Sequence, residues 1–225
     1  MHYFSTRVAP NIYDKYSYTK VFCYSLFMIR AIFFDFYSVW TPDKFSYYLA
    51  VAQQNGPEVY KEMSDLVESY YHGQVDINIV ADTFRVKLGH PDISVNQFRL
   101  QETDISPDII NFMRNLHAHF LKIGILANLG SQEYQLLNTF NEHNQIFEVI
   151  ASPFSLQSPA PLLSKDVFAM ALQNIGEPLD SCLLVSGNPS FLEFATSLGV
   201  AVHQFEGLAK LQKTLDQLLA SDLPQ

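Results

Sequence analysis

The amino-acid sequence predicts an α/β fold, in which a parallel sheet carries a helical insertion after its first strand. The segment AIFFD, residues 31–35, is a short unbroken apolar run of the kind that is buried on both faces of a parallel sheet. Residues 43–103 then change to helical periodicity. After residue 103, apolar runs of strand length alternate with amphipathic segments, which is the pattern of strand–helix–strand units with right-handed crossovers.

The predicted insertion consists of short helices that are joined by turn residues. Its apolar side chains recur at helical spacing in three stripes, which are Phe45, Tyr48, Leu49 and Ala52; Val59, Met63, Leu66, Val67 and Tyr70; and Ile79, Val80, Phe84 and Leu88. Turn-forming Gly and Pro residues separate the stripes. We therefore expect a helical subdomain over residues 43–103, inserted into a core that is formed by residues 28–42 and 104–225.

The core is expected to contain four further strands, which alternate with helices on both faces of the sheet to make three layers. The expected strands are residues 122–127, 147–151, 181–185 and 200–203. The expected helices are residues 109–120, 131–144, 165–175, 189–198 and 208–219. Gly176 and Gly199 follow two of these helices, at the position where glycine commonly ends a helix.

Residues 1–27 are expected to form an appendage outside this core. The apolar run at residues 21–29 loosely resembles a signal peptide, but Arg30 interrupts it and no small-residue cleavage site follows. The run is also shorter than the roughly 20 residues that span a bilayer. Met28 lies directly before the first predicted strand, so an alternative interpretation is that the natural chain begins there.

The composition argues against several classes of partner. The formal net charge of −9 disfavours a nucleic-acid-binding protein, which would present a basic surface. No membrane segment is expected. The two cysteines, Cys23 and Cys182, lie in apolar runs without the spacing of a zinc site, and we interpret them as buried thiols of a cytoplasmic protein.

Asp35 is the first candidate for chemistry, because it is an ionisable residue at the carboxyl end of a buried strand. A buried carboxylate is costly unless it has partners or a function. Ligands of open α/β sheets bind just outside the carboxyl ends of the strands. Asn128, Ser186 and Asn188 follow two other predicted strands and would share that edge, although such residues also stabilise turns. The helix that follows Gly130 would present free backbone N–H groups, which attract an anion.

The order of the elements resembles that of the haloacid dehalogenase superfamily, which has a Rossmann-like core and a helical cap. A strand that ends in Asp comes first, a helical insertion follows it, and four strand–helix units complete the chain. The resemblance covers about residues 29–219. The segment SCLLVSGNPSFLEFATSLGVAVHQF is similar to the fourth motif of the superfamily and the strand that follows it. The resemblance implies that Asp35 is a nucleophile, which attacks an electrophile and forms an ester that water later hydrolyses.

Several residues that the resemblance implies for a phosphatase are absent. Tyr37 stands where a second Asp would act as general acid and base. Ser186 and Gly187 stand where acidic residues would help to hold Mg²⁺, so no metal or other cofactor is expected. Ala127 replaces the hydroxyl residue that would bind a phosphoryl oxygen, and Asn128 follows it.

The lysine of the third motif is also out of register. Counting back six residues from Phe168 gives Leu162, whereas Lys165 lies three residues later, which is close to one helical turn. Lys165 therefore remains a candidate that would have to reach the site by another path. The binding candidates are Asn128, Lys165, Ser186 and Asn188.

Two functions follow from these matches and departures. The first is a hydrolase-like protein with degraded motifs, weak or inactive as a phosphatase, which keeps the cleft to bind a small anionic ligand or a protein partner. The second is a metal-independent hydrolase of the 2-haloacid dehalogenase type, in which Asp35 displaces a halide that needs no proton. Tyr37, Ser186 and Asn188 match that branch, whereas Ala127 and Phe191 depart from it.

Overall fold

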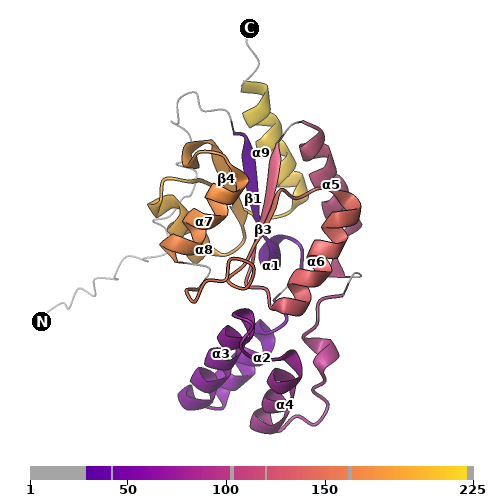
Figure 1. Ribbon diagram of the computed structural model, residues 1–225, viewed down its shortest axis with the longest axis vertical. Helices are drawn as coiled ribbons and strands as arrows, with labels where there is room; N and C mark the ends of the chain where they lie inside the picture. Colours follow the sequence, from indigo (N-terminus) through magenta and orange to yellow (C-terminus); the bar gives the residue numbers. More distant parts are fainter. Residues whose placement is uncertain (1–28, 42, 102–103, 120, 162–163, 222–225) are drawn as a thin grey trace, which may run out of the picture.

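A single parallel sheet forms the centre of the protein (Figure 1). The computed structural model describes residues 29–41, 43–101, 104–119, 121–161 and 164–221. Within these residues the sheet has five strands in the order β3-β2-β1-β4-β5. They are β1 (Ala31–Asp35), β2 (Lys122–Leu126), β3 (Val149–Ala151), β4 (Cys182–Ser186) and β5 (Ala201–Gln204). All neighbouring pairs run parallel, so the predicted α/β fold is confirmed.

Helices cover both faces of the sheet and make a three-layer core. The helices of the described residues are α1 (Phe36–Val39), α2 (Ser46–Gln54), α3 (Pro57–Tyr71), α4 (Ile77–Leu88), α5 (Pro107–Ala118), α6 (Ser131–Asn144), α7 (Lys165–Ile175), α8 (Pro189–Ser197) and α9 (Leu208–Ser221), with short 3₁₀ turns at η2 (Val95–Gln97) and η4 (Leu179–Ser181). One hydrophobic cluster joins the sheet to α5, α6 and α9, and a second joins it to α7 and α8.

Strand β1 shows why the first apolar run is a central strand. All five of its residues are buried, and its side chains alternate between the two hydrophobic clusters. Phe33 lies opposite Gly124 of β2, and a Cβ atom at Gly124 would lie 2.5 Å from the Phe33 ring. Glycine at this position therefore makes room for a large aromatic side chain in the middle of the sheet.

The helical insertion packs around a hydrophobic cluster of its own. The side chains of α2, α3, α4 and η2 form this cluster, in which the Phe45 and Phe98 rings stack with centroids 5.0 Å apart. The chain leaves the core after α1 and returns before α5, and Figure 1 shows the insertion as a separate layer below the sheet. We call this helical layer the cap; it lies at the end of the molecule toward which the β1 strand points.

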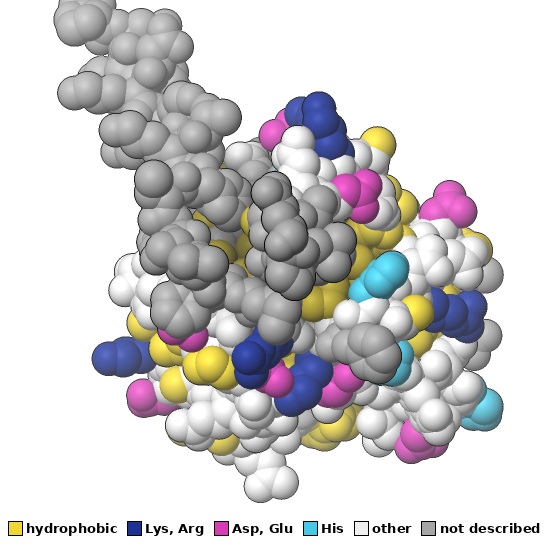
Figure 2. Space-filling view, turned by 90° about the horizontal axis from the view of Figure 1, so that it is seen from above, with side chains coloured by type: hydrophobic (Ala, Val, Ile, Leu, Met, Phe, Trp, Pro, Cys, Tyr) yellow, Lys and Arg dark blue, Asp and Glu magenta, His cyan; other side chains and the backbone are white. Residues whose placement is uncertain are grey.

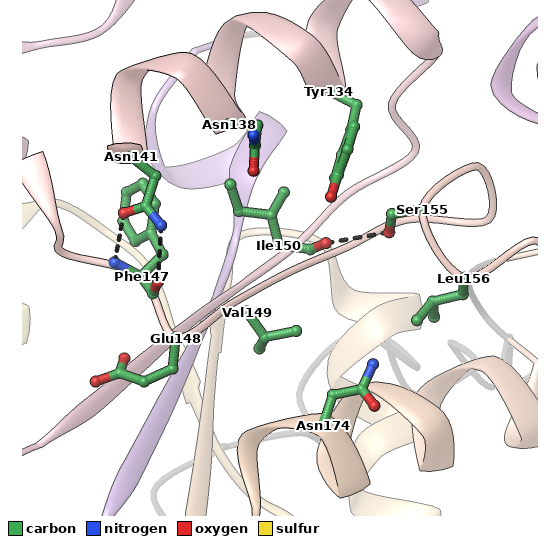
Figure 3. Close-up of a pocket in the computed structure, with 10 residues that line it drawn as sticks. All are labelled: Tyr134, Asn138, Asn141, Phe147, Glu148, Val149, Ile150, Ser155, Leu156 and Asn174. Carbon is green, nitrogen blue, oxygen red and sulfur yellow. Dashed lines mark hydrogen bonds between the residues drawn. The ribbon is translucent and has the colours of Figure 1, made fainter. Parts of the chain in front are cut away.

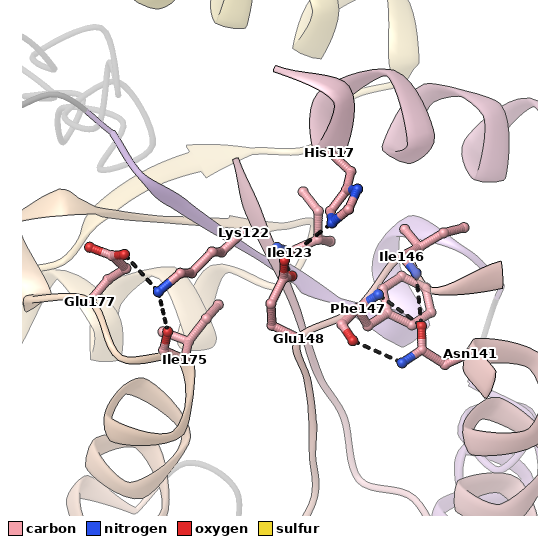
Figure 4. Close-up of polar contacts among 9 residues, drawn as sticks. All are labelled: His117, Lys122, Ile123, Asn141, Ile146, Phe147, Glu148, Ile175 and Glu177. Carbon is pink, nitrogen blue, oxygen red and sulfur yellow. Dashed lines mark hydrogen bonds and ion pairs between the residues drawn. The ribbon is translucent and has the colours of Figure 1, made fainter. Parts of the chain in front are cut away.

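Polar contacts fix helices and loops at the amino end of β2, away from Asp35 (Figure 4). The Lys122 Nζ donates to the Ile175 carbonyl at 3.0 Å and pairs with Glu177 at 2.8 Å. The Glu148 carboxylate accepts the Ile123 N–H at 2.6 Å and lies 3.4 Å from His117. These contacts join α5, α7 and the loops beside β2 and β3 to the sheet.

The structure corrects some predicted boundaries. The third strand begins at Val149 rather than at residue 147, because the N–H groups of Ile146 and Phe147 donate to the Asn141 side-chain oxygen at 3.0 and 2.8 Å instead of to a neighbouring strand (Figure 4). The first strand ends at Asp35, and the short helix α1 follows directly. The predicted appendage at residues 1–27, together with Cys23 and Met28, lies outside the described residues, whereas Cys182 is a buried free thiol.

The surface opposite the cap carries mixed charge. On the face shown in Figure 2, Lys and Arg side chains of the described residues lie beside Asp and Glu side chains and form no continuous basic surface. None of the helices in the described part of the chain combines the length and the apolar character that crossing a bilayer requires.

Candidate active site

The candidate site lies at the carboxyl ends of β1, β2 and β4. Asp35 is paired in register with Leu126, and Phe34 is paired with Val185, so Ser186 ends β4 at the same level as Asp35. The chain turns into α1 immediately after Asp35, which places Ser38 one helical turn beyond it. The sheet thus brings the predicted residues Asp35 and Ser186 together and adds Ser38 to them.

Two serine hydroxyls hold the Asp35 carboxyl. The Oδ2 atom of Asp35 accepts hydrogen bonds from Ser186 Oγ at 2.6 Å and from Ser38 Oγ at 2.7 Å. Each hydroxyl in turn accepts a backbone N–H, since Gly187 donates to Ser38 at 2.8 Å and Asn188 donates to Ser186 at 3.0 Å. Asp35 is only 8% exposed. The carboxyl therefore belongs to a closed network that contains no cation among the described residues.

Burial raises the pKa of Asp35 above its ordinary value of 3.8. The Ser186 and Ser38 hydroxyls and the nearby Tyr37 N–H lower it, and the negative charge of Asp43 raises it again. Desolvation outweighs the hydrogen bonds because none of these partners carries a full positive charge. The neutral carboxylic acid is thus favoured relative to an Asp in water.

Tyr37 lies between the core and the cap. Its ring packs edge-to-face against Phe36, with centroids 5.3 Å apart. Burial raises the pKa of Tyr37 well above its ordinary value, and the charges of Glu133, Asp43 and Asp35 raise it further, while a contact with the Tyr71 hydroxyl lowers it. The phenol therefore keeps its proton, in a region where three carboxyl groups converge.

The side chains of the other predicted binding residues make no hydrogen bond to Asp35. Asn188 is exposed and caps α8, because its side-chain oxygen accepts the Ser190 N–H at 3.0 Å. Asn128 is half-buried and makes no side-chain hydrogen bond with the described residues. Lys165 is the exposed first residue of α7 and forms no ion pair with any described carboxylate, while Leu162 lies outside the described residues. A binding role for these side chains stays a prediction.

Sequence reasoning missed a carboxyl group that comes from α6. Glu133 is only 3% exposed, and the Tyr70 hydroxyl of the cap donates to its Oε2 atom. Burial raises the pKa of Glu133, while the Tyr70 hydroxyl, the backbone N–H groups of Glu133 and Gly130, and the charge of Arg99 lower it. An acidic residue in the first turn of a helix that follows the second strand was a signal that could have identified it.

The Tyr70 ring also covers the loop after β2. A Cβ atom at Gly130 would lie 2.3 Å from the Tyr70 ring, so the ring rests directly on the backbone of this loop. Asp43 approaches from the segment that leads into the cap, where the Tyr71 hydroxyl donates to its Oδ1 atom at 3.4 Å. Burial raises the pKa of Asp43 as well. Tyr70 and Tyr71 of the cap thus contact two carboxyl groups, those of Glu133 and Asp43.

The donor set around Asp35 does not match a magnesium site. Magnesium in proteins favours carboxylates in octahedral geometry, whereas the groups that contact Asp35 are two hydroxyls and a backbone amide. Among the described residues, no cluster of three or more His, Cys, Asp or Glu side chains is placed to hold a metal ion. The predicted loss of the magnesium site remains a prediction for a binding measurement.

A cavity of about 240 Å³ lies elsewhere, beside the outer edge of β3 (Figure 3). Its lining includes no predicted site residue and consists of Tyr134, Asn138, Asn141, Phe147, Glu148, Val149, Ile150, Ser155, Leu156 and Asn174. The Ile150 carbonyl at this edge already accepts the Ser155 hydroxyl at 3.1 Å. We place the candidate active site at Asp35 rather than at this cavity, because the cavity lacks a nucleophile–base pair and holds its polar groups largely in internal contacts.

Comparison with known proteins identifies the fold. No family model matches the sequence, and no curated protein matches it. A predicted HAD-like family hydrolase from Porphyromonas gingivalis is similar in structure, with a TM-score of 0.56, 15% identity, and coverage of 84% of this chain and 98% of that chain. A HAD family enzyme from Bacteroides thetaiotaomicron, in complex with magnesium and inorganic phosphate, gives a TM-score of 0.52 at 13% identity, over 78% of this chain and 93% of that chain.

A dehalogenase has the same architecture. L-2-haloacid dehalogenase from Xanthobacter autotrophicus gives a TM-score of 0.50 at 17% identity, over 87% of this chain and 84% of that chain. At these identities the likeness concerns the fold alone, and it extends over most of each chain. The protein therefore has the fold of the haloacid dehalogenase (HAD)-like hydrolases.

Proposed function

We propose that the protein is a HAD-like hydrolase relative that is weak or inactive as a phosphatase and that binds a small anionic ligand or a protein partner near Asp35. One observation carries the proposal: the Asp35 carboxyl is held by the Ser38 and Ser186 hydroxyls, and no described cation contacts it. A nucleophilic carboxylate must be ionised, and burial of Asp35 favours its neutral form.

The proton supply supports the same conclusion. A leaving alkoxide needs a general acid, and loss of that acid typically slows a reaction by roughly 10² to 10⁴-fold. Tyr37 stands at that position, and the pKa of its phenol is raised well above the ordinary value, so it is poorly matched to proton transfer near neutral pH. The B. thetaiotaomicron enzyme is described with magnesium and phosphate, whereas the side chains that contact Asp35 in this protein are the hydroxyls of Ser38 and Ser186.

Phosphatase activity is the first test. We expect hydrolysis of p-nitrophenyl phosphate in Mg²⁺ to be indistinguishable between the wild type, Asp35→Asn, and the control Asp166→Asn, which changes an exposed residue of α7. Turnover that requires Mg²⁺, disappears in Asp35→Asn and persists in Asp166→Asn would contradict the proposal.

A second candidate is a metal-independent hydrolase of the 2-haloacid dehalogenase type. The Ser186 hydroxyl, which donates to Asp35 Oδ2, favours it, because a hydrogen bond can orient the carboxyl for displacement of a halide that needs no proton. Incubation with 2-chloropropionate in EDTA tests it through two readouts, chloride release and an ester on Asp35 detected by mass spectrometry. Absence of both removes this candidate, and either one that depends on Asp35 establishes it.

A further inference from the structure

We propose that the cavity beside the outer edge of β3 binds a short, extended and uncharged peptide segment, which adds to the sheet next to β3 (Figure 3). This site is separate from Asp35, because no residue of its lining contacts the Asp35 carboxyl. The proposal therefore goes beyond the proposed function and does not depend on it.

The first support is the open backbone of β3. In the described part of the chain, β2 is the only strand that pairs with it. Alternate residues of a parallel strand turn both backbone groups toward the same side. The Glu148 N–H donates to the Ile123 carbonyl at 2.9 Å, so the next residue, Val149, turns its N–H and its carbonyl toward the open side. An edge residue of this kind is a template for another extended chain.

The neighbours of Val149 hold this edge in place. The Phe147 N–H donates to the Asn141 side-chain oxygen at 2.8 Å, and the Ile150 carbonyl accepts the Ser155 hydroxyl at 3.1 Å. The backbone is thus fixed on both sides of Val149, while no described side chain bonds to Val149 itself. An edge that is already ordered loses little further freedom when a partner binds.

The walls of the cavity add neutral hydrogen-bonding groups from both faces of the sheet. Helix α6 on one face supplies Tyr134 and Asn138, and helix α7 on the other face supplies Asn174 (Figure 3). The Tyr134 hydroxyl and the Asn174 amide make no hydrogen bond with the described residues. Asn138 uses its Nδ2 atom, which donates to Glu142 at 2.8 Å, and keeps its oxygen open. The open groups include donors and acceptors, as a peptide backbone requires.

The charge of the lining favours an uncharged ligand. Among the described residues that line the cavity, only Glu148 carries a charge. Its carboxylate accepts the Ile123 N–H at 2.6 Å and lies 3.4 Å from His117. An anionic ligand would be repelled by this carboxylate, and a cationic ligand would have to compete with the contacts that it already makes. A neutral peptide segment meets neither obstacle.

The shape of the cavity favours a single extended segment over a folded partner. The β3 edge lies between side chains of α6 and α7, beside a space of about 240 Å³. The three residues of β3 correspond to roughly 10 Å of extended chain, which is the length of about three peptide residues. A second folded copy carries the same helices beside its own β3, so the two edges would be kept apart.

The test is an NMR titration of the full-length protein with the capped tripeptide N-acetyl-Thr-Val-Thr-amide, whose residues favour strands. We expect saturable shifts of the Val149 backbone amide and of the Asn174 side-chain amide. A control peptide with proline in place of its central valine lacks the N–H that would face Val149. It should bind at least roughly fivefold more weakly, which corresponds to the loss of one hydrogen bond.

Two variants of the protein test the contacts from the other side. Asn174→Ala removes an exposed amide without a described partner and should weaken tripeptide binding roughly fivefold. The control Gln173→Ala changes the preceding exposed residue of α7, which lies outside the cavity, and should bind as the wild type does. Val149→Pro removes the open N–H at the first residue of an edge strand, where proline is tolerated, and should weaken binding at least as much.

Absence of saturable shifts at Val149 in the folded wild type would overturn the proposal. Equal tripeptide affinity in the wild type, Asn174→Ala and Val149→Pro would also overturn it. Asp35→Asn should bind the tripeptide as the wild type does, since Asp35 lies outside this cavity. The turnover assay therefore judges the proposed function separately, and either proposal can fail without the other.

Discussion

At the scale of single residues, the chemistry of the site depends on how the Asp35 carboxyl is solvated. Removal of a carboxylate from water costs free energy that a neighbouring cation usually offsets. Here Ser38 and Ser186 offer hydroxyls, which stabilise the charged form less than a lysine or a metal would. The raised pKa of Asp35 is the consequence.

Ser186→Ala tests this network directly. The change removes a hydroxyl that donates to Asp35 and accepts the Asn188 N–H, so Asp35 Oδ2 keeps only its bond from Ser38 and the Asn188 N–H loses its acceptor. We expect the free energy of unfolding to fall by about 1–3 kcal/mol and the pKa of Asp35 to rise further. Urea denaturation and NMR titration measure these two effects.

A matched control lies on the next helix. Ser197 is exposed near the end of α8, and its hydroxyl donates only to the Phe194 carbonyl. Ser197→Ala should change the free energy of unfolding by less than about 0.5 kcal/mol. Equal losses in the two variants would show that the hydroxyl of Ser186 has no special role at Asp35.

The sequence located some of these residues because their positions follow from local order. Asp35 and Ser186 end apolar runs, and parallel strands bring their carboxyl ends to one edge. Asn188 was identified as a turn residue and as a ligand candidate, and the structure shows its capping contact. Tyr70 and Glu133 could not be paired from the sequence, because 63 positions separate them and only the docking of the cap brings them together.

At the scale of elements, helix α3 and the loop before α6 determine how the cap sits on the core. Tyr70 is 2% exposed and its hydroxyl is fixed on Glu133, so its ring has little freedom to move away from Gly130. The backbone of Gly130 has a φ of −74°, which any residue adopts. Glycine is therefore required here by the approach of the ring and not by backbone conformation.

Gly130→Ala should force this contact apart. Its Cβ atom would lie 2.3 Å from the Tyr70 ring, and overpacking of this kind typically costs about 1–3 kcal/mol of unfolding free energy. We also expect faster amide hydrogen exchange at the end of α3. In a Tyr70→Ala background the ring is gone, so the added methyl group should cost much less, and a double-mutant cycle measures the difference. Additive effects in this cycle would contradict the contact.

The elements themselves were largely predictable, and their ends were not. Helices α6 and α7 begin and end at the predicted residues, since polar or glycine residues border each apolar stripe. Strand β3 starts later than its apolar run because the Asn141 side chain takes the backbone N–H groups of Ile146 and Phe147. The start of β3 is thus set by a side chain of another element, α6, and no pattern within the strand could reveal it.

At the scale of the whole molecule, the core domain and the cap meet through polar contacts. The sheet buries one apolar cluster on each face and the cap buries a third, while the boundary carries Asp35, Asp43 and Glu133. Lys44 and Asp104, where the chain enters and leaves the cap, form an ion pair at 2.9 Å. Polar boundaries of this kind permit relative motion of their parts more readily than apolar ones.

The acidic boundary makes the stability of the protein depend on pH. Burial raises the pKa values of Asp35, Asp43 and Glu133 in the folded protein above their ordinary values. A carboxyl with a raised folded-state pKa stabilises the fold most at low pH, and this contribution is lost as the pH rises through the folded-state value. For Asp35 this stabilising contribution is therefore complete below about pH 3.8 and is lost as the pH rises above that value and the folded-state carboxyl ionises.

The central claim is that Asp35 is a buried carboxyl held by hydroxyls and without a cation, and a ¹³C NMR titration of its side-chain carboxyl tests this most directly. We predict that the Asp35 carboxyl titrates with a midpoint above 3.8 and that Mg²⁺ changes this midpoint little. The loss of stability as the pH rises should be smaller in Asp35→Asn than in the wild type, because Asp43 and Glu133 still contribute to it. A midpoint at or below 3.8, or a large fall of the midpoint on addition of Mg²⁺, would show that a positive charge supports this carboxyl and would contradict the account.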